Sequence, residues 1–211
     1  MTRMDPERLR ILVADDHPML REGVVGLVNR QSDMVVVGEA HDGEEAVRLF
    51  ESLQPDIVLM DVQMPRMSGL EAIQEIRKID PGAAVLVLTT YAGDMLATQA
   101  IKSGASGYLL KNCIRRDLLD TLRGVSAGKK VVSPEVAQEI ALHSGIGPLT
   151  PRELRALQFV AEGASNKDIA RKLGISVDTV KLDMKSVFEK LDVADRTHAV
   201  VVAIRRGYLA V

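Results

Sequence analysis

Apolar and polar residues alternate along the first 130 residues in blocks that predict strands and helices in turn. Five short and nearly continuous apolar runs begin at Arg10, Met34, Ile57, Ala84 and Gly107. Such runs are typical of strands that are buried on both faces. The segments between the runs carry apolar residues at helical spacing, and strands that alternate with helices form a parallel sheet covered on both faces. We therefore expect a five-stranded, doubly wound parallel sheet of the α/β class.

A different pattern begins after residue 127. Residues 128–130 end the last helix of the first domain, and Ser133-Pro134 starts a short helix that reaches about Leu142. Residues 143–148 are then predicted to form a loop, because they are rich in small residues and end in proline. We expect a first domain over 1–127, a linker with a short helix over 128–148, and a second domain over 149–211.

The second domain is predicted to be entirely helical. Thr150 and Glu153 form a capping box that fixes the start of its first helix. Two further helices begin after Ser165 and Ser176 and are separated by a glycine-containing turn, and a fourth spans about 196–206. Two short helices joined by such a turn form a helix-turn-helix, so we expect a small helix-turn-helix domain.

Composition and charge narrow the class of protein. Hydrophobic residues make up 46% of the chain and charged residues 27%, which favours a folded protein over a disordered one. Cys113 is the only cysteine, and no apolar run reaches the length of a membrane span, so we expect a cytoplasmic protein with no membrane partner. Residues 149–211 carry 11 Lys and Arg against 8 Asp and Glu, a weak indication that the second domain binds nucleic acid.

Polar residues end four of the predicted strands, at the edge where a doubly wound sheet binds its ligands. They are Asp15 and Asp16, Asp61, Thr89 and Lys111. Clustered carboxylates repel one another unless a cation neutralises them, and their oxygens suit Mg²⁺. Each residue alone has an ordinary explanation, such as a helix cap for Asp15 and Asp16 or a turn for Asp61. Their joint placement instead predicts a site for a metal ion and a phosphoryl group.

At these residues the chain resembles the receiver domain of bacterial response regulators, from Arg10 to about Ala127, and the resemblance implies a flavodoxin-like fold. It is carried by Asp15-Asp16, residues 56–61, Met64-Pro65, Gly69, Thr89 and residues 107–111. The resemblance implies that Asp61 accepts a phosphoryl group from a sensor histidine kinase. It also implies that Asp16, Asp61 and the backbone carbonyl of Gln63 hold Mg²⁺, with Asp15 acting largely through water.

The same resemblance assigns roles to residues around the acceptor. Lys111 holds a phosphoryl oxygen, and Thr89 and Tyr108 form a switch pair in which Thr89 moves toward the phosphate and Tyr108 rotates into the vacated space. Gln63 and Tyr91 flank the approach of water to the phosphate, where Tyr91 either shields it or is an ordinary surface aromatic. We expect no redox role for Cys113.

The second domain resembles the LuxR-type DNA-binding domain of the NarL/FixJ subfamily. The motifs that carry the resemblance are residues 149–153, 162–170, 173–176, 179–181 and 190–191. The third helix of this domain exposes Lys181, Leu182 and Lys185 opposite its apolar stripe, and an apolar group between two lysines suits the major groove of DNA. The resemblance implies that these three residues read bases, the alternative being a merely solvated helix face.

Five residues at helix starts are expected to hold phosphates, because backbone N–H groups and small polar side chains gather there. They are Ser165, Asn166, Lys167, Ser176 and Thr179. Asp183 departs from the family pattern, and we expect its carboxylate either to weaken DNA binding or to contact cytosine. The apolar last helix, around residues 199–204, exceeds what a small core needs, so part of it is expected to form a dimer surface.

These features predict a two-component transcription regulator. Phosphorylation of Asp61 would promote a homodimer that binds a pseudo-palindromic promoter site. One alternative is a DNA-binding protein that works without phosphorylation. A second is a phosphatase with an aspartyl nucleophile, against which Gln63 argues, because such enzymes usually carry an acidic residue at that position. The linker permits a receiver that covers the third helix as well as one that is independent of it.

Overall fold

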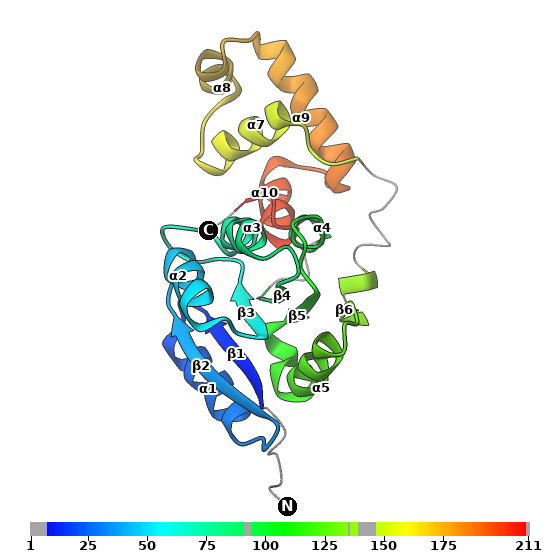
Figure 1. Ribbon diagram of the computed structural model, residues 1–211. Coiled ribbons are helices and arrows are strands. Elements are labelled where there is room, and N and C mark those ends of the chain that lie inside the picture. Colours follow the sequence, from blue (N-terminus) through cyan, green and yellow to red (C-terminus); the bar gives the residue numbers. More distant parts are fainter. Residues whose placement is uncertain (1–7, 91–93, 135, 139–146, 210–211) are drawn as a thin grey trace, which may run out of the picture. The chain divides into compact units, whose positions relative to one another are not determined.

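The computed structural model describes residues 8–90, 94–134, 136–138 and 147–209 (Figure 1). The chain divides into two compact units, one made of residues 1–90 and 97–137 and one that contains residues 138–211. Each unit has its own hydrophobic core. Among the described helices, none combines the length and the hydrophobicity that a membrane span requires.

A six-stranded parallel sheet in the order β2-β1-β3-β4-β5-β6 forms the centre of the N-terminal unit. The five predicted strands are confirmed, and β3 is buried along its whole length. The sixth strand pairs with β5 and was not predicted, because two residues are too short to give a hydrophobic pattern. The strands are β1 (Leu9–Ala14), β2 (Met34–Ala40), β3 (Ile57–Asp61), β4 (Ala84–Thr89), β5 (Gly107–Leu110) and β6 (Val131–Val132).

Helices cover both faces of this sheet (Figure 1). They are α1 (Pro18–Asn29), α2 (Gly43–Leu53), α3 (Gly69–Ile79), α4 (Asp94–Lys102) and α5 (Ile114–Ser126), with a 3₁₀ turn η1 (Lys111–Cys113) before α5. Because β1 and β3 are neighbours while β2 lies beyond β1, the strand order reverses at this pair. The carboxyl ends of β1 and β3 therefore flank the crevice where ligands bind in doubly wound sheets.

The C-terminal unit is helical, as predicted. Its helices are α7 (Pro151–Ala161), α8 (Asn166–Leu173), α9 (Val177–Leu191) and α10 (Arg196–Arg205). The capping box of Thr150 and Glu153 is present, and Ser165 and Ser176 cap α8 and α9 through their side chains. Gly174 adopts the left-handed conformation (φ 67°) that the tight turn between these helices requires. Between the two units, the predicted short helix begins at residue 134, and most of its expected length lies outside the described residues.

Candidate functional site

The carboxylates predicted to gather at one edge of the sheet do lie together. Asp15 follows β1 and Asp61 ends β3, and these neighbouring strands place both side chains in the crevice where strand order reverses. Asp15 is 0% exposed and Asp61 3% exposed, whereas the side chain of Asp16 is 32% exposed. The site is thus a buried pair of acids with a third acid at its rim.

Among the residues that the structure describes, one lysine faces the two buried acids. Lys111, at the end of β5, places its Nζ 2.8 Å from Asp15 Oδ2 and 2.7 Å from Asp61 Oδ2, with only 10% of its side chain exposed. Burial would lower the pKa of Lys111, but the bonds to both carboxylates outweigh it and raise the pKa. Burial raises the pKa of Asp61, and the nearby charge of Asp15 adds to the rise although Lys111 opposes it. The single charge of Lys111 does not neutralise two buried carboxylates, so a further cation would be attracted to this site.

The donor atoms at this site suit a divalent cation. Ligand atoms of Asp15, Asp16, His17 and Asp61 all lie within 4.8 Å of one another. The backbone N–H of Gln63 donates to Asp61 Oδ1 at 3.4 Å, so the loop after β3 turns closely around the carboxylate. Oxygen-rich sites of this kind suit Mg²⁺. His17 was not predicted from the sequence as a member of the group.

Gly69 explains how the loop after β3 can stay so close to Asp61. A side-chain Cβ at Gly69 would collide with the backbone carbonyl of Asp61, and the N–H of Gly69 donates to the carbonyl of Val62 at 3.0 Å. Only glycine lets the start of α3 approach the end of β3 in this way. The loop that surrounds the acid is therefore held in place by backbone contacts.

Thr89 and Tyr108 occupy the neighbouring strands. Both residues are buried, Thr89 at the end of β4 and Tyr108 within β5, where its ring is 0% exposed. Burial raises the pKa of Tyr108 to about 12, and the negative charge of Asp61 adds to the rise, against a hydrogen bond with the Thr89 side chain. In this structure the ring of Tyr108 already lies inside the unit. It is hydrogen-bonded to Thr89, the other member of the predicted switch pair.

A second acidic group lies at the start of α2. His41, Asp42 and Glu45 also bring possible metal ligands together. The guanidinium group of Arg66 forms an ion pair with the buried Asp42, so the protein supplies the positive charge here itself. The cation of this group is thus paired with its buried acid, whereas Glu45, with 26% of its side chain exposed, is partly solvated.

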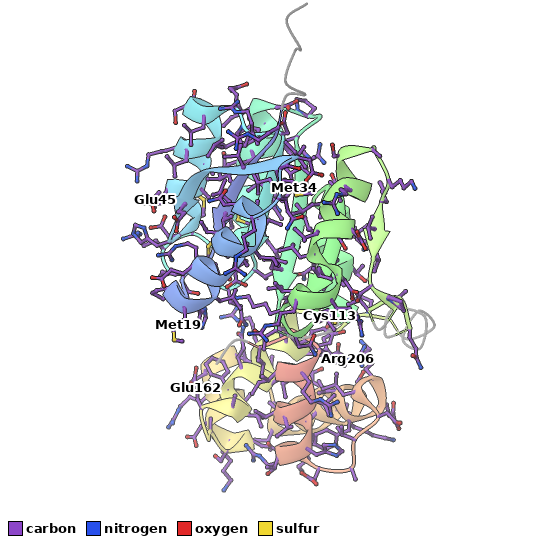
Figure 2. The ribbon with its side chains drawn as sticks, turned by 90° about the horizontal axis from the view of Figure 1, so that it is seen from below. Met19, Met34, Glu45, Cys113, Glu162 and Arg206 are labelled. Carbon is purple, nitrogen blue, oxygen red and sulfur yellow. The ribbon has the colours of Figure 1, made fainter. Side chains whose placement is uncertain are left out.

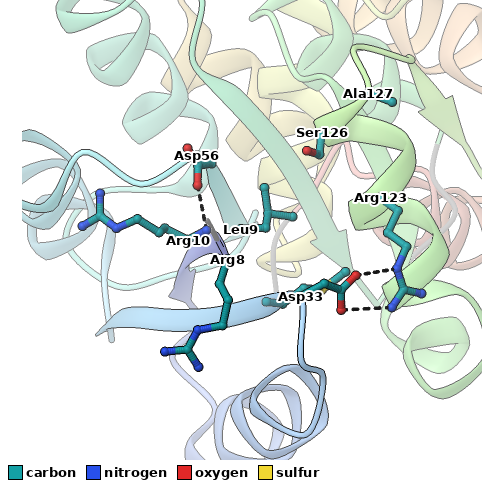
Figure 3. Close-up of a pocket in the computed structure, with 9 residues that line it drawn as sticks. Arg8, Leu9, Arg10, Asp33, Asp56, Arg123, Ser126 and Ala127 are labelled. Atoms are coloured by element: carbon teal, nitrogen blue, oxygen red, sulfur yellow. Dashed lines mark hydrogen bonds and ion pairs between the residues drawn. The ribbon is translucent and has the colours of Figure 1, made fainter. Parts of the chain in front are cut away.

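A hollow of about 540 Å³ lies near the amino end of β1, the opposite edge from the acidic site (Figure 3). Both of its acids have partners within the protein: Arg123 contacts Asp33 at 3.0 Å, and the backbone N–H of Arg10 donates to Asp56 at 2.7 Å. Ligands of doubly wound sheets bind at the carboxyl ends of the strands. The charges in this hollow instead tie α5 and β3 to neighbouring loops and strands.

The predicted recognition surface on α9 is exposed as expected. Lys181, Leu182 and Lys185 all face solvent, and the large apolar side chain of Leu182 is 68% exposed. Lys181 forms a surface ion pair with Asp178 at 3.0 Å. Such a pair contributes little to stability, so the lysine is free to exchange it for another anion.

The five residues expected at helix starts are also where they were predicted. Ser165 is the N-cap of α8, and Asn166 and Lys167 form its first turn. Ser176 caps α9, and its hydroxyl is 2.8 Å from that of Thr179. Asn166 and Lys181 line the same shallow pocket, so the start of α8 lies beside an exposed lysine of α9.

The expectation for Asp183 is wrong. Its side chain is 6% exposed and accepts two hydrogen bonds from Arg152, one from Nε at 2.7 Å and one from Nη2 at 2.8 Å. Position 183 lies beside Met184 on the inward side of α9, toward α7, rather than on the face that carries Leu182. Asp183 therefore neither faces a DNA phosphate nor contacts a base, and Arg152 is its unpredicted partner.

Three smaller expectations have different outcomes. Tyr91 lies outside the residues that the structure describes. Cys113 is a free, buried thiol at the end of η1 (Figure 2). In α10, Ala199 and Ala203 are fully buried in the core of the C-terminal unit, while Val201 is 50% exposed, so only part of the apolar surface of this helix remains uncovered.

Two family models match the chain. Residues 11–123 match the response regulator receiver domain, and residues 147–203 match bacterial regulatory proteins of the luxR family. The chain belongs to the luxR-type response regulators. This response regulator therefore combines a receiver domain with a LuxR-type DNA-binding domain, the composition of a two-component transcription regulator.

Relatives match the response regulator over nearly its full length. It is 39% identical to the uncharacterized transcriptional regulatory protein YxjL of Bacillus subtilis, over 97% of this chain and 99% of YxjL. It is 38% identical to the nitrate/nitrite response regulator protein NarL of Escherichia coli, over 92% of this chain and 94% of NarL. A solved structure of RcsB from Salmonella enterica serovar Typhimurium, bound to a promoter with phosphomimetic BeF₃⁻, is similar with a TM-score of 0.75 at 26% identity, covering 93% of this chain and 98% of that one.

Proposed function

We propose that this response regulator accepts a phosphoryl group on Asp61 from a sensor histidine kinase, then dimerises and binds promoter DNA. The observation that carries the proposal is the buried Asp61 carboxylate at the reversal point of the sheet, 2.7 Å from the ammonium group of Lys111. We assign the receiver to residues 1–127, the linker to 128–148 and the DNA-binding domain to 149–211. The protein would work in the cytoplasm, where its DNA is found.

Phosphoryl transfer needs a nucleophile and groups that balance the charge of the phosphoryl oxygens. An oxygen of Asp61 forms a bond to phosphorus while the bond between phosphorus and the donor histidine breaks. Lys111 holds one phosphoryl oxygen, and the hydroxyl of Thr89 donates a hydrogen bond to another. Because Gln63 cannot serve as a general acid, the protein holds its phosphoryl group as an acceptor and is not a turnover enzyme.

The acidic residues would hold Mg²⁺ beside the acceptor. Asp16, Asp61 and the backbone carbonyl of Gln63 are the proposed direct ligands, with Asp15 acting largely through water. When bound, the ion supplies positive charge that neutralises the transferred group. This is in accord with the cluster of oxygen donors and with the position of Lys111 between two buried acids.

The switch is proposed to run through Thr89 and Tyr108. Because their side chains are hydrogen-bonded, a Thr89 hydroxyl that turns toward a phosphoryl group gives up its bond to Tyr108. The ring is then free to settle in a new position, which reshapes the surface around α4 and β5. We propose that this change promotes a homodimer.

In the dimer, two copies of α9 would enter successive major grooves of a pseudo-palindromic site. Lys181, Leu182 and Lys185 would contact bases, since they form the exposed face of α9. The phosphate contacts would come from the helix starts, namely Ser165, Asn166, Lys167, Ser176 and Thr179.

Light scattering with and without beryllofluoride and Mg²⁺ tests the proposal, on the native chain and on Asp61→Ala. We expect a shift from monomer to dimer in the native chain only, together with tighter binding to promoter DNA. If both proteins bind DNA equally with and without beryllofluoride, the regulator works without phosphorylation and the proposal is overturned.

A further inference from the structure

His17 points its side chain at the acids of the proposed metal site. Its Nδ1 is 2.7 Å from Asp16 Oδ1 and 3.3 Å from Asp15 Oδ1. Neighbouring ligands of an octahedral ion, each about 2.1 Å from the metal, lie roughly 3.0 Å apart. The two observed distances straddle that separation, so the imidazole nitrogen is spaced from both carboxylates as a fellow ligand of one ion would be.

The backbone around His17 holds this orientation. His17 is the N-cap of α1, and Pro18 at the next position restricts it to the extended conformation that it has, with φ −91° and ψ 104°. Its N–H donates to Asp15 Oδ1 at 2.8 Å, which fixes it against the acid. Residues at N-caps commonly bond to the helix through their side chains, but the imidazole of His17 makes no such bond. The ring instead turns toward the carboxylates.

We infer that His17 is a nitrogen ligand of the metal site and that it shifts the preference of the receiver toward divalent transition-metal ions. The inference rests on the proposed metal site at Asp16 and Asp61. Mg²⁺ prefers oxygen ligands, whereas imidazole suits the later divalent transition metals, and the affinity of a given site rises from Mn²⁺ through Co²⁺ to Cu²⁺. Because the His17 side chain is 67% exposed, the ring reaches the ion without a large cost of burial.

The direct test is the electron spin-echo envelope modulation (ESEEM) spectrum of Mn²⁺ bound to the full chain. We expect the nitrogen coupling of a directly bound imidazole in the native protein and its loss in His17→Asn. His41→Gln is the matched control, because His41 also lies beside two carboxylates of the receiver, and it should keep the coupling. Coupling that is absent from the native protein, or lost in His41→Gln instead, overturns the inference.

Calorimetric titration with Co²⁺ and Mg²⁺ supplies a second readout. We expect His17→Asn to weaken Co²⁺ binding about tenfold, since the loss of even an outer partner commonly weakens a metal site by that much. The affinity for Mg²⁺ should stay within about twofold, whereas a merely structural role of His17 would weaken both ions alike. If Mn²⁺ binds without nitrogen coupling, only the inference fails. If neither the native chain nor His41→Gln binds any divalent ion, the proposed metal site fails with it.

Discussion

The buried charge of Glu153 stabilises the C-terminal domain. It is 5% exposed, completes the capping box with Thr150, and lies 2.7 Å from Lys190 of α9. Burial raises the pKa of Glu153, but hydrogen bonds from Lys190, Ser186 and Thr150 outweigh burial and lower the pKa to about 2. The charged form of this carboxyl therefore stabilises the folded domain.

This lowered pKa predicts a pH dependence of stability. A carboxyl whose pKa falls on folding stabilises the protein above its unfolded pKa of 4.5, and that stability is lost as the pH falls toward about 2. The contribution is of the order of 3 kcal/mol. Urea unfolding of the DNA-binding domain, followed between pH 6 and 2, should show this loss in the native chain and a clearly smaller one in Glu153→Gln. Equal slopes for both proteins would contradict the assignment.

Single residues also show what the sequence could predict of the site. Asp15, Asp61, Thr89 and Lys111 were predictable because each directly follows or ends an apolar strand, and parallel strands end at a common edge. The orientation of His17 was not, because it depends on a side-chain rotamer that no hydrophobic pattern specifies. The pairing of Asp183 with a residue 31 positions away was equally hidden, since it arises only when helices pack.

At the scale of elements, α7 holds α9 at two points. Arg152 bonds to Asp183 and the neighbouring Glu153 bonds to Lys190. Positions 183 and 190 are two helical turns apart on the same side of α9, so the two contacts fix its rotation. This rotation places Leu182 and the lysines outward.

Removing one of these contacts should therefore change DNA binding indirectly, by altering the rotation of α9. We expect Asp183→Ala to lower affinity for promoter DNA roughly tenfold, and the double variant with Arg152→Ala to lose little more than either single variant, as coupled neighbours do. Fluorescence anisotropy with labelled promoter DNA measures both. Asp178→Ala is the control, because it removes a carboxylate from the exposed face and should keep or raise affinity. Additive losses would show that Asp183 and Arg152 act separately.

Elements differ in how far the sequence predicts them. Strands β1 to β5 and the four C-terminal helices followed from hydrophobic spacing and capping residues, which are local signals. Strand β6 did not, because Val131 and Val132 join the sheet through backbone bonds to β5 that only the folded sheet offers. Its pairing is a tertiary effect rather than a property of those two residues.

At the scale of the whole molecule, charge is divided unevenly between the domains. Residues 149–211 carry 11 basic and 8 acidic residues, whereas the other residues carry 16 basic and 21 acidic ones. Three excess charges give a single DNA-binding domain little non-specific attraction to DNA. Two such domains on one DNA site would double the number of phosphate contacts.

The salt dependence of DNA binding reports this doubling. The logarithm of affinity falls with the logarithm of salt concentration by about 0.9 for each phosphate neutralised. We expect beryllofluoride and Mg²⁺ to increase this slope about twofold for the native chain and to leave it unchanged for Asp61→Ala. Titrations with promoter DNA at several salt concentrations give the slope. An unchanged slope in the native chain would mean that no second domain joins the complex.

The short strand β6 also limits how far the two domains can separate. The N–H of Ser133 donates to the carbonyl of Tyr108 and Val136 is fully buried, so the receiver unit holds the chain to about residue 137, and the described residues of the DNA-binding domain begin at 147. The stretch of chain between these points, even fully extended, reaches roughly 35 Å. Each domain therefore meets its neighbour at an effective concentration in the millimolar range. At that concentration an attraction between the domains with a dissociation constant of about 0.1 mM would be largely saturated, although the same attraction would go undetected between separate chains at micromolar concentration.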